Sequence, residues 1–270
     1  MLKIGWFSTG RGEGSRGLLQ FVQERILRGD LDAKLEFVFS NRAPGEAEGS
    51  DQFFQLVHKH GLPLLTSSSA QFRRERGGRW SRLREEYDRR VMALLQNYRP
   101  DICVLAGYML IVGGEMCRRY PLLNLHPALP DGPIGTWQEV IWELMRQRAT
   151  RTGAMIHLAT VEVDRGPVIA HCTVPIVGEP FDTCWRGLDA LDLDRVREDQ
   201  GEEFPLFQLI RQAGFRKEPY LILETLRAVS QGRVRPRAGE VLDGAGRLLS
   251  EGLPQGLCLD AEIERAMRKG

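Results

Sequence analysis

The sequence has few cysteines, no long apolar run and no surplus of one charge. Its five cysteines are scattered and form no C-x-x-C pair, which argues against a disulfide framework and a zinc site. No stretch approaches the ~20 apolar residues that span a bilayer, and the start, Met1 to Trp6, has no signal-peptide pattern. A formal net charge of +1 does not favour nucleic acid or a charged membrane as partner. We therefore expect a cytoplasmic protein, and the sequence leaves open whether it is a monomer or a homodimer.

Apolar strands and amphipathic segments alternate along the first half of the chain. The pattern predicts strands at 3–8, 34–40, 62–65 and 101–106, separated by helices at 18–27, 52–60 and 80–96. The run 101–106 is continuously apolar, which is typical of a parallel strand buried on both faces. This order predicts an α/β fold with a doubly wound, Rossmann-like and mostly parallel sheet.

The second half is less regular. Short strands are expected at 122–125, 153–159 and 167–174, a helix at 136–145, and one or two helices within 206–231. Asp243-Gly244 and Gly246 predict a terminal hairpin that extends the sheet. We interpret 1–270 as a single domain with a Rossmann-like half (1–106), a second half (107–232), and a C-terminal hairpin and tail (233–270).

A glycine-rich turn follows the first strand. Gly12 to Gly17 matches G-x-G-x-x-G, in the context of a dinucleotide-binding turn, where backbone N–H groups can approach a phosphate. Arg42 follows the second strand in place of an acid, which fits an NADP oxidoreductase. No Tyr-x-x-x-Lys pair lies downstream, so a phosphate of some kind is favoured over a dinucleotide. The loops 10–17, 40–42 and 107–109 all leave carboxyl ends of strands and are expected to face one cleft.

Polar residues cluster around a later strand. Asn124 and His126 are at i and i+2, and therefore point to the same side of an extended segment. Asp164 lies in a glycine- and proline-containing loop before another strand. Each alone is typical of a structural residue, whereas the three together indicate a functional site.

These residues carry a family resemblance. Residues 123–130 (LNLHPALP) resemble the N-x-H-P-S-L-L-P motif of the folate-dependent formyltransferases, and 157–169 resemble their H-x-x-T-x-x-x-D-x-G-P-V-I segment. Further similarity, which favours the purine-synthesis branch, lies at 38–41, 104–109, 203–207 and 242–244. The resemblance implies the formyltransferase fold and transfer of a formyl group from 10-formyltetrahydrofolate to the amine of glycinamide ribonucleotide. These substrates are small molecules, and no metal is required.

The resemblance also implies roles for the polar cluster. Asn124, His126 and Asp164 would be the catalytic trio. Asn124 and a protonated His126 would donate hydrogen bonds to the oxyanion of a tetrahedral intermediate. Asp164 would raise the imidazole pKa and help a water to move the proton of the attacking amine. His157 would support the trio or pack within its strand.

Both substrate sites are implied in the same way, with departures from the family pattern. The ribonucleotide side would comprise Gly10, Arg11, Gly12, Gly14, Ser15, Arg16 and Glu203. The folate side would comprise Tyr108, Met109, Leu110, Ile111 and Val161. Arg16 replaces a family asparagine, Leu110 an arginine and Val161 an acid. These departures leave the exact acceptor and donor open, and four alternatives remain: transfer to another amine, hydrolysis of formyl-folate, an NADP-dependent oxidoreductase, and a catalytically silent binding homologue.

Overall fold

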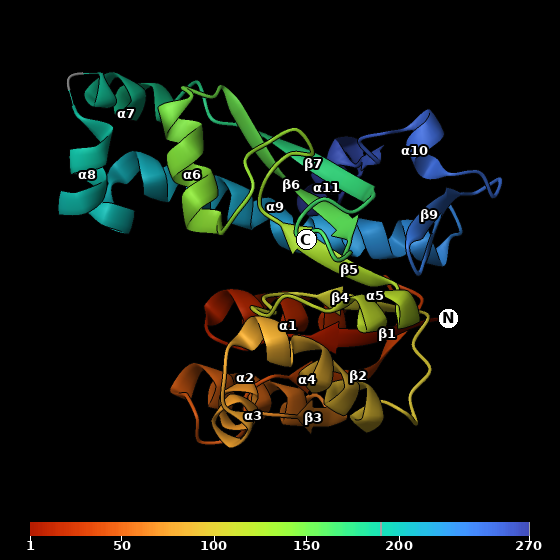
Figure 1. Ribbon diagram of the computed structural model, residues 1–270. Coiled ribbons are helices and arrows are strands. Elements are labelled where there is room, and N and C mark those ends of the chain that lie inside the picture. The colour runs from red at the N-terminus through yellow and green to blue at the C-terminus, as the bar shows by residue number, and fades with distance from the viewer. Residues whose placement is uncertain (190, 270) are drawn as a thin grey trace.

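An eight-stranded sheet organises the chain in the computed structural model, which describes residues 1–189 and 191–269 (Figure 1). The strand order is β10-β7-β6-β5-β4-β1-β2-β3. β6 runs antiparallel to β5 and β7, and the other pairs are parallel. The predicted doubly wound, mostly parallel sheet is therefore confirmed. The strands are β1 (Leu2–Phe7), β2 (Ala33–Ser40), β3 (Leu64–Thr66), β4 (Ile102–Leu105), β5 (Leu122–His126), β6 (Arg151–Leu158), β7 (Val168–Pro175) and β10 (Leu257–Cys258).

The N-terminal strands are buried on both faces because their side chains alternate between two cores. Ile4 and Trp6 of β1 enter the first core, and Phe7 enters the second. The first core is covered by α1 (Glu13–Leu27), α2 (Glu48–Lys59), the C-terminal part of α9 (Pro205–Ser230) and α11 (Asp260–Lys269). The second is covered by α3 (Ser69–Arg76), α4 (Trp80–Leu94) and α5 (Gly114–Arg119). Helices on both faces are what continuous apolar strands require.

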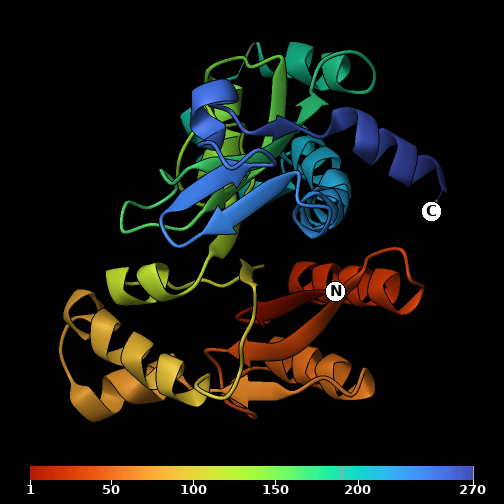
Figure 2. The same cartoon turned by 90° about the vertical axis from the view of Figure 1, so that its right-hand side faces the viewer.

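A third core lies beside the antiparallel strands. It is formed by α6 (Trp137–Arg146), α7 (Phe181–Leu188), α8 (Leu193–Asp199) and the start of α9, which follows the 3-10 turn η1 (Gly201–Glu203). These elements lie in the upper part of Figures 1 and 2, and the chain up to α5 lies in the lower part. Helices α7 and α8 occupy most of the segment 182–200, for which the resemblance gives no counterpart. Within that segment position 190 lies outside the described residues, as position 270 does within the predicted tail.

Several helices differ from the prediction: α2 begins at Glu48 rather than Gln52, and neither α5 nor α11 was predicted. Helix α1 begins at Glu13 rather than Leu18, so Gly14 and Gly17 are helical instead of part of the turn. A Cβ added to Gly14 would lie 3.2 Å from the ring of Phe215 on α9, so packing between these helices favours glycine in a position of low helix propensity. Helix α3 was not predicted. Ser68 caps it by accepting a hydrogen bond from the Gln71 backbone N–H at 2.9 Å.

The C-terminal hairpin exists, but its turn and pairing differ from the prediction. Its strands β8 (Val234–Arg237) and β9 (Glu240–Asp243) form a separate two-stranded sheet, connected through Gly239 with φ +90°. Asp243 instead closes the next turn, where it accepts from backbone N–H groups of Ala245 and Arg247. The short helix α10 (Leu249–Gly252) follows. The main sheet is extended by β10, which pairs in parallel with β7.

No helix within the described part of the chain is long and apolar enough to cross a membrane.

Candidate active site

Strand β5 is the place where the parallel and antiparallel halves of the sheet meet. On one side it pairs in parallel with β4, and Leu105 lies opposite Asn124. On the other side it pairs antiparallel with β6, and Asn124 lies opposite His157. This register brings the side chains of Asn124 and His157 together, because directly opposite residues of a strand pair share one face of the sheet.

Asp164 is brought to the same place by the loop between β6 and β7. The residue has φ +55°, a left-handed conformation that Asp and Asn adopt more readily than most side chains. Two residues later the loop passes so close to β6 that a Cβ on Gly166 would lie 1.7 Å from the Leu158 carbonyl oxygen. Only glycine fits there without a shift of the backbone. The loop geometry thus fixes the carboxylate over β5.

The four polar side chains form one network of short contacts. Asn124 Nδ2 lies 3.0 Å from His157 Nε2 and 3.3 Å from Asp164 Oδ1. Asp164 Oδ1 is 3.3 Å from His157 Nε2, and its Oδ2 is 3.5 Å from His126 Nδ1. His126 Nε2 lies 3.2 Å from the Pro133 carbonyl oxygen. The structure therefore brings together the three residues predicted as the trio, with His157 in direct contact with two of them.

The hydrogen-bond partners constrain the proton positions. His157 Nδ1 lies 3.1 Å from the Leu158 carbonyl oxygen, which can only accept, so Nδ1 carries a proton. In a neutral His157 ring, Nε2 then accepts from Asn124, and the second amide hydrogen is donated to Asp164. A protonated His157 would donate from Nε2 to Asp164 and release one N–H of Asn124. The charge on His157 thus decides whether Asn124 has a free donor.

Burial opposes the sequence-based expectation of a protonated His126. The ring is buried, and burial lowers its pKa below the usual value although Asp164 and the Pro133 carbonyl act in the opposite direction. The protonated imidazole implied by the family resemblance stays a prediction. In either state Nε2 carries a proton, because the Pro133 carbonyl oxygen 3.2 Å away can only accept.

Asp164 is held in its ionised form. Burial raises its pKa, but the hydrogen bond from His157 and the proximity of both histidines outweigh this effect, so the pKa lies below the usual range. The side chain is 13% exposed, and one edge of the carboxylate therefore reaches solvent. An ionised, partly accessible carboxylate between two imidazoles is suited to accept or relay a proton.

Thr9, which was not singled out in the sequence, joins the three loops at the carboxyl ends of the strands. Its backbone N–H donates to the Gly107 carbonyl at 2.9 Å, and its hydroxyl donates to Asn41 Oδ1 at 2.8 Å. The same hydroxyl accepts from the Met109 N–H at 2.9 Å. The loops predicted to face one cleft are thus directly connected. A threonine after a strand is too common to be noticed in a sequence without these contacts, which span up to 100 residues.

The glycine loop ends in the N-terminus of α1. Gly10 has φ +68°, and Gly12 is the extended N-cap residue, without a side-chain cap. The first N–H groups of a helix lack intrahelical acceptors, so those of Glu13, Gly14 and Ser15 are suited to an anion. Ser15 also faces the loop 107–109, since a Cβ on Gly107 would lie 2.6 Å from its hydroxyl. The phosphate site stays a prediction, on a loop that is shorter than expected because α1 begins at Glu13.

The profile of the Formyl transferase family matches residues 13–183. The chain belongs to the formyl transferase family. It is 29% identical over 172 residues to phosphoribosylglycinamide formyltransferase of Escherichia coli (strain K12), covering 62% of this chain and 70% of that protein. The enzyme of the same name from Schizosaccharomyces pombe is 28% identical over 176 residues, covering 63% and 80%.

A solved structure has the same fold. Glycinamide ribonucleotide transformylase 1 from Symbiobacterium toebii superposes with a TM-score of 0.63 at 24% sequence identity, covering 89% of this chain and 93% of that one. The formyl transferase fold is therefore shown over most of the chain. Family membership decides against the NADP oxidoreductase as the interpretation of the glycine loop.

The side of this formyl transferase that was predicted to hold folate is unusually apolar at its surface. Met109, Ile111 and Val161 are 55%, 47% and 58% exposed, although their side chains are hydrophobic. Val161 lies against the start of α5, since a Cβ on Gly114 would be 3.0 Å from it. The ring of Tyr108, by contrast, points into the core beside Phe7, so its backbone alone is available to a ligand.

The predicted ribonucleotide residues are not all adjacent. Arg11 is exposed and Arg16 is partly buried in the first turn of α1. Glu203 precedes α9 and accepts from Gln208. Phe215, the α9 residue against Gly14, lies ten residues after the start of α9, or about 15 Å along the axis. Glu203 therefore lies well away from the glycine loop.

No group of three or more His, Cys, Asp or Glu side chains in positions 1–189 and 191–269 is arranged to hold a metal ion.

Proposed function

We propose that this protein transfers the formyl group of 10-formyltetrahydrofolate to the amine of glycinamide ribonucleotide in purine biosynthesis. The observation that carries the proposal is the contact network of Asn124, His126, His157 and Asp164 at the junction strand β5. The curated relatives named above, which are phosphoribosylglycinamide formyltransferases, support the choice of acceptor.

The first step is addition of the acceptor amine to the formyl carbon. The amine lone pair forms the new C–N bond, and the C=O electron pair moves to oxygen to give a tetrahedral oxyanion. His126 donates its Nε2–H to this oxygen in place of the Pro133 carbonyl, which accepts it in the free protein. Asn124 contributes the second donor with an N–H of Nδ2 that contacts His157 or Asp164 in the free protein. Donors fixed before the reaction are the main source of stabilisation in such steps.

The second step moves a proton and breaks the old bond. The added nitrogen carries a surplus proton, which passes through a water to the ionised carboxylate of Asp164. The same proton is then delivered to the folate nitrogen as its bond to the formyl carbon breaks and the C=O bond is restored. The low pKa of Asp164 fits a transient relay, because the carboxylate releases the proton readily.

The loops supply the binding sites in this proposal. Gly10, Arg11, Gly12, Gly14, Ser15 and Arg16 bind the phosphate of the acceptor through the N-terminus of α1 and two guanidinium groups. The backbone of Tyr108 and the side chains of Met109, Leu110, Ile111 and Val161 hold the folate ring against an apolar surface. Glu203 contacts the ribonucleotide only if the acceptor extends from the glycine loop towards the start of α9.

The wider assignment is part of the same proposal. We infer a single functional unit in which residues 1–106 bind phosphate, 107–232 bind folate and carry the chemistry, and 233–270 complete the fold. The enzyme works in the cytoplasm on small molecules, as a monomer or a homodimer, with no metal, nucleic acid or membrane required. The five free cysteines support a reducing compartment.

The test is an absorbance assay of donor deformylation with and without glycinamide ribonucleotide. We expect deformylation by the wild-type protein only with the ribonucleotide, and a loss of at least about 100-fold in His126→Ala, as for loss of one oxyanion donor. His58→Ala, an exposed histidine on α2, is the matched control and retains wild-type turnover.

The other outcomes separate the alternatives. Deformylation without any acceptor identifies a formyl-folate hydrolase. Turnover with other amines but not with the ribonucleotide identifies a different acceptor. Absence of turnover with folate binding retained identifies a silent homologue, and wild-type turnover in His126→Ala contradicts the assignment of the site.

A further inference from the structure

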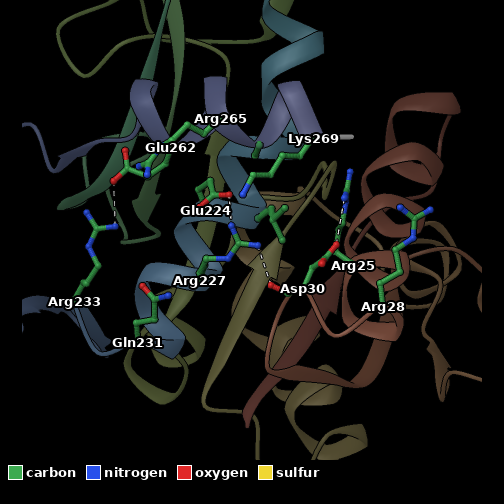
Figure 3. A pocket seen from close by; sticks show the side chains of 12 residues that line it. Arg25, Arg28, Asp30, Glu224, Arg227, Gln231, Arg233, Glu262, Arg265 and Lys269 are labelled. Carbon is green, nitrogen blue, oxygen red and sulfur yellow. Dashed lines mark hydrogen bonds and ion pairs between the residues drawn. The ribbon is translucent and has the colours of Figure 1, made fainter.

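A second concave site lies where α1, α9 and α11 converge, at the end of α1 opposite the glycine loop (Figure 3). Its volume is about 740 Å³, within the range of about 300–1,000 Å³ that small-molecule sites occupy. The side chains of six cationic residues line it: Arg25, Arg28, Arg227, Arg233, Arg265 and Lys269. Figure 3 shows them entering from all three helices and the start of the C-terminal hairpin.

Three acidic side chains neutralise half of these cations. Asp30 pairs with Arg25 at 3.2 Å, Glu224 with Arg227 at 2.5 Å, and Glu262 with Arg233 at 3.3 Å. These are the acids of the lining, so an excess of three positive charges remains. Within the described residues neither Arg28 nor Arg265 makes an ion pair, and both side chains are exposed.

Helix dipoles offset only part of this excess positive charge. Arg28 is the C-cap residue of α1, Gln231 that of α9, and Lys269 is the last residue of α11, so three helix C-termini meet here. Each C-terminus carries roughly half a negative charge, and the three together offset about half of the surplus. The remaining positive charge is concentrated in a concave site, where the potential attracts a counterion.

The lining also indicates the kind of anion. Five of the six cations are arginines, whose planar guanidinium groups match phosphate oxygens in a bidentate geometry. The apolar lining residues are Leu223 and Ala266, and none of the described lining side chains is aromatic, so a nucleobase has nothing to stack on. We propose that this pocket binds a small multivalent phosphate, such as a polyphosphate or a phosphorylated sugar.

This pocket is separate from the candidate active site. Helix α1 has 15 residues and is therefore about 22 Å long, with the glycine loop at one end and Arg25 and Arg28 at the other. The proposal thus concerns a ligand other than the formyl acceptor, and it does not depend on the proposed function. The bound phosphate would link α11 to α1 and α9, and so increase the stability of the C-terminal packing.

The test is isothermal titration of the full chain with inorganic tripolyphosphate at constant ionic strength. We expect saturable binding at this pocket, and a thermal midpoint raised by about 5 °C at a hundredfold excess over Kd. Arg28→Gln and Arg265→Gln combined should weaken this binding at least about tenfold, since each removes a charge-assisted contact. Neither residue has an ion-pair partner among the described residues, so the variant is expected to fold.

A matched control makes the test specific. Arg268→Gln removes the same charge from α11 outside the pocket and leaves binding unchanged. Absence of saturable binding overturns the proposal, as does binding that the double variant retains. If single-stranded RNA binds more tightly than tripolyphosphate, and if Arg268→Gln weakens that binding as much as the double variant does, the surface binds nucleic acid. This result would also overturn the proposal.

Discussion

Replacement of Asp164 by Asn tests the electrostatic core of the mechanism. The amide has the shape of the carboxylate and tolerates the left-handed backbone with φ +55°, so the loop geometry is preserved. What disappears is the negative charge 3.5 Å from His126 Nδ1. At an effective dielectric constant of about 20, that charge is worth about 5 kcal/mol to a fully cationic imidazole.

The expected effect on rate is smaller than this limit. A protonated His126 shares its Nε2 proton with the oxyanion and so keeps only part of its charge, and the carboxylate is 13% exposed, so we take about half the value. A loss of about 2.5 kcal/mol in transition-state stabilisation corresponds to roughly a hundredfold lower kcat. The KM values should change little, because neither substrate gains or loses a direct contact in the ground state.

Steady-state kinetics with both substrates measure this effect. Glu162→Gln is the control, because it removes the same charge two residues earlier from an exposed side chain. It should retain kcat within about threefold. A kcat above a tenth of the wild-type value in Asp164→Asn would refute the reasoning, and so would an equal loss in the control.

Three further outcomes follow from the structure. Gly166→Ala places a Cβ 1.7 Å from the Leu158 carbonyl oxygen, and should destabilise the fold by about 2–4 kcal/mol in urea unfolding, with loss of turnover. Asp88 is buried, and its pKa is raised from 3.8 to about 6, so its contribution to stability falls as pH rises from 4 to 6. Asp88→Asn should therefore raise the free energy of unfolding by about 3 kcal/mol at pH 7 and leave it unchanged at pH 4, as measured by urea unfolding. The pKa of His126 is lowered, so the unfolded chain binds the proton more tightly and the free energy of unfolding falls as pH drops below 6.5. His126→Gln should reduce this fall, which is measured by urea unfolding at pH 7 and at pH 5.

Most of the sheet could be predicted because its strands are buried on both faces. Continuous apolar runs such as 102–105 have few other interpretations when glycine and proline punctuate the chain around them. The start of α1 was predicted wrongly for the opposite reason. Glycine disfavours helix locally, but the contact of Gly14 with Phe215, 201 residues away in the chain, requires a residue without a side chain.

Two features that were predicted wrongly, helix α3 and the hairpin turn, had a signal in the sequence. Ser68 and Gln71 have the spacing of a capping box, and Ser68 does cap α3 through the Gln71 N–H. The prediction placed the hairpin turn at Asp243-Gly244 because that pair has the stronger turn propensity. In the structure the hairpin turns at Gly239, and Asp243 closes the following turn. Propensity identified a turn here without deciding which strands it joins.

The polar trio could be selected from the sequence, whereas its protonation could not. The motif places Asn124, His126 and Asp164 near each other, and the contacts among them agree. Whether His126 is charged depends on how deeply the ring is buried and on the Pro133 carbonyl, and neither follows from residue spacing. The charge on His126 therefore stays a prediction, although the contacts bring the three residues together.

The junction at β5 explains why the departures from the family pattern near the substrate loops leave the geometry of the polar network intact. Its parallel partner β4 leads directly into Gly107, which is tied through Thr9 to the first loop, while its antiparallel partner β6 carries His157. One strand thus sets the distance between the loops that hold the substrates and the side chains that act on them. Arg16 lies in the first turn of α1 and Val161 on the loop between β6 and β7, so both can change what is bound without moving β5. A change of register in β5 would instead separate the proposed substrate loops from the polar network. An intact junction with altered substrate contacts therefore fits the proposal that the formyl transfer chemistry is kept while the substrate contacts differ.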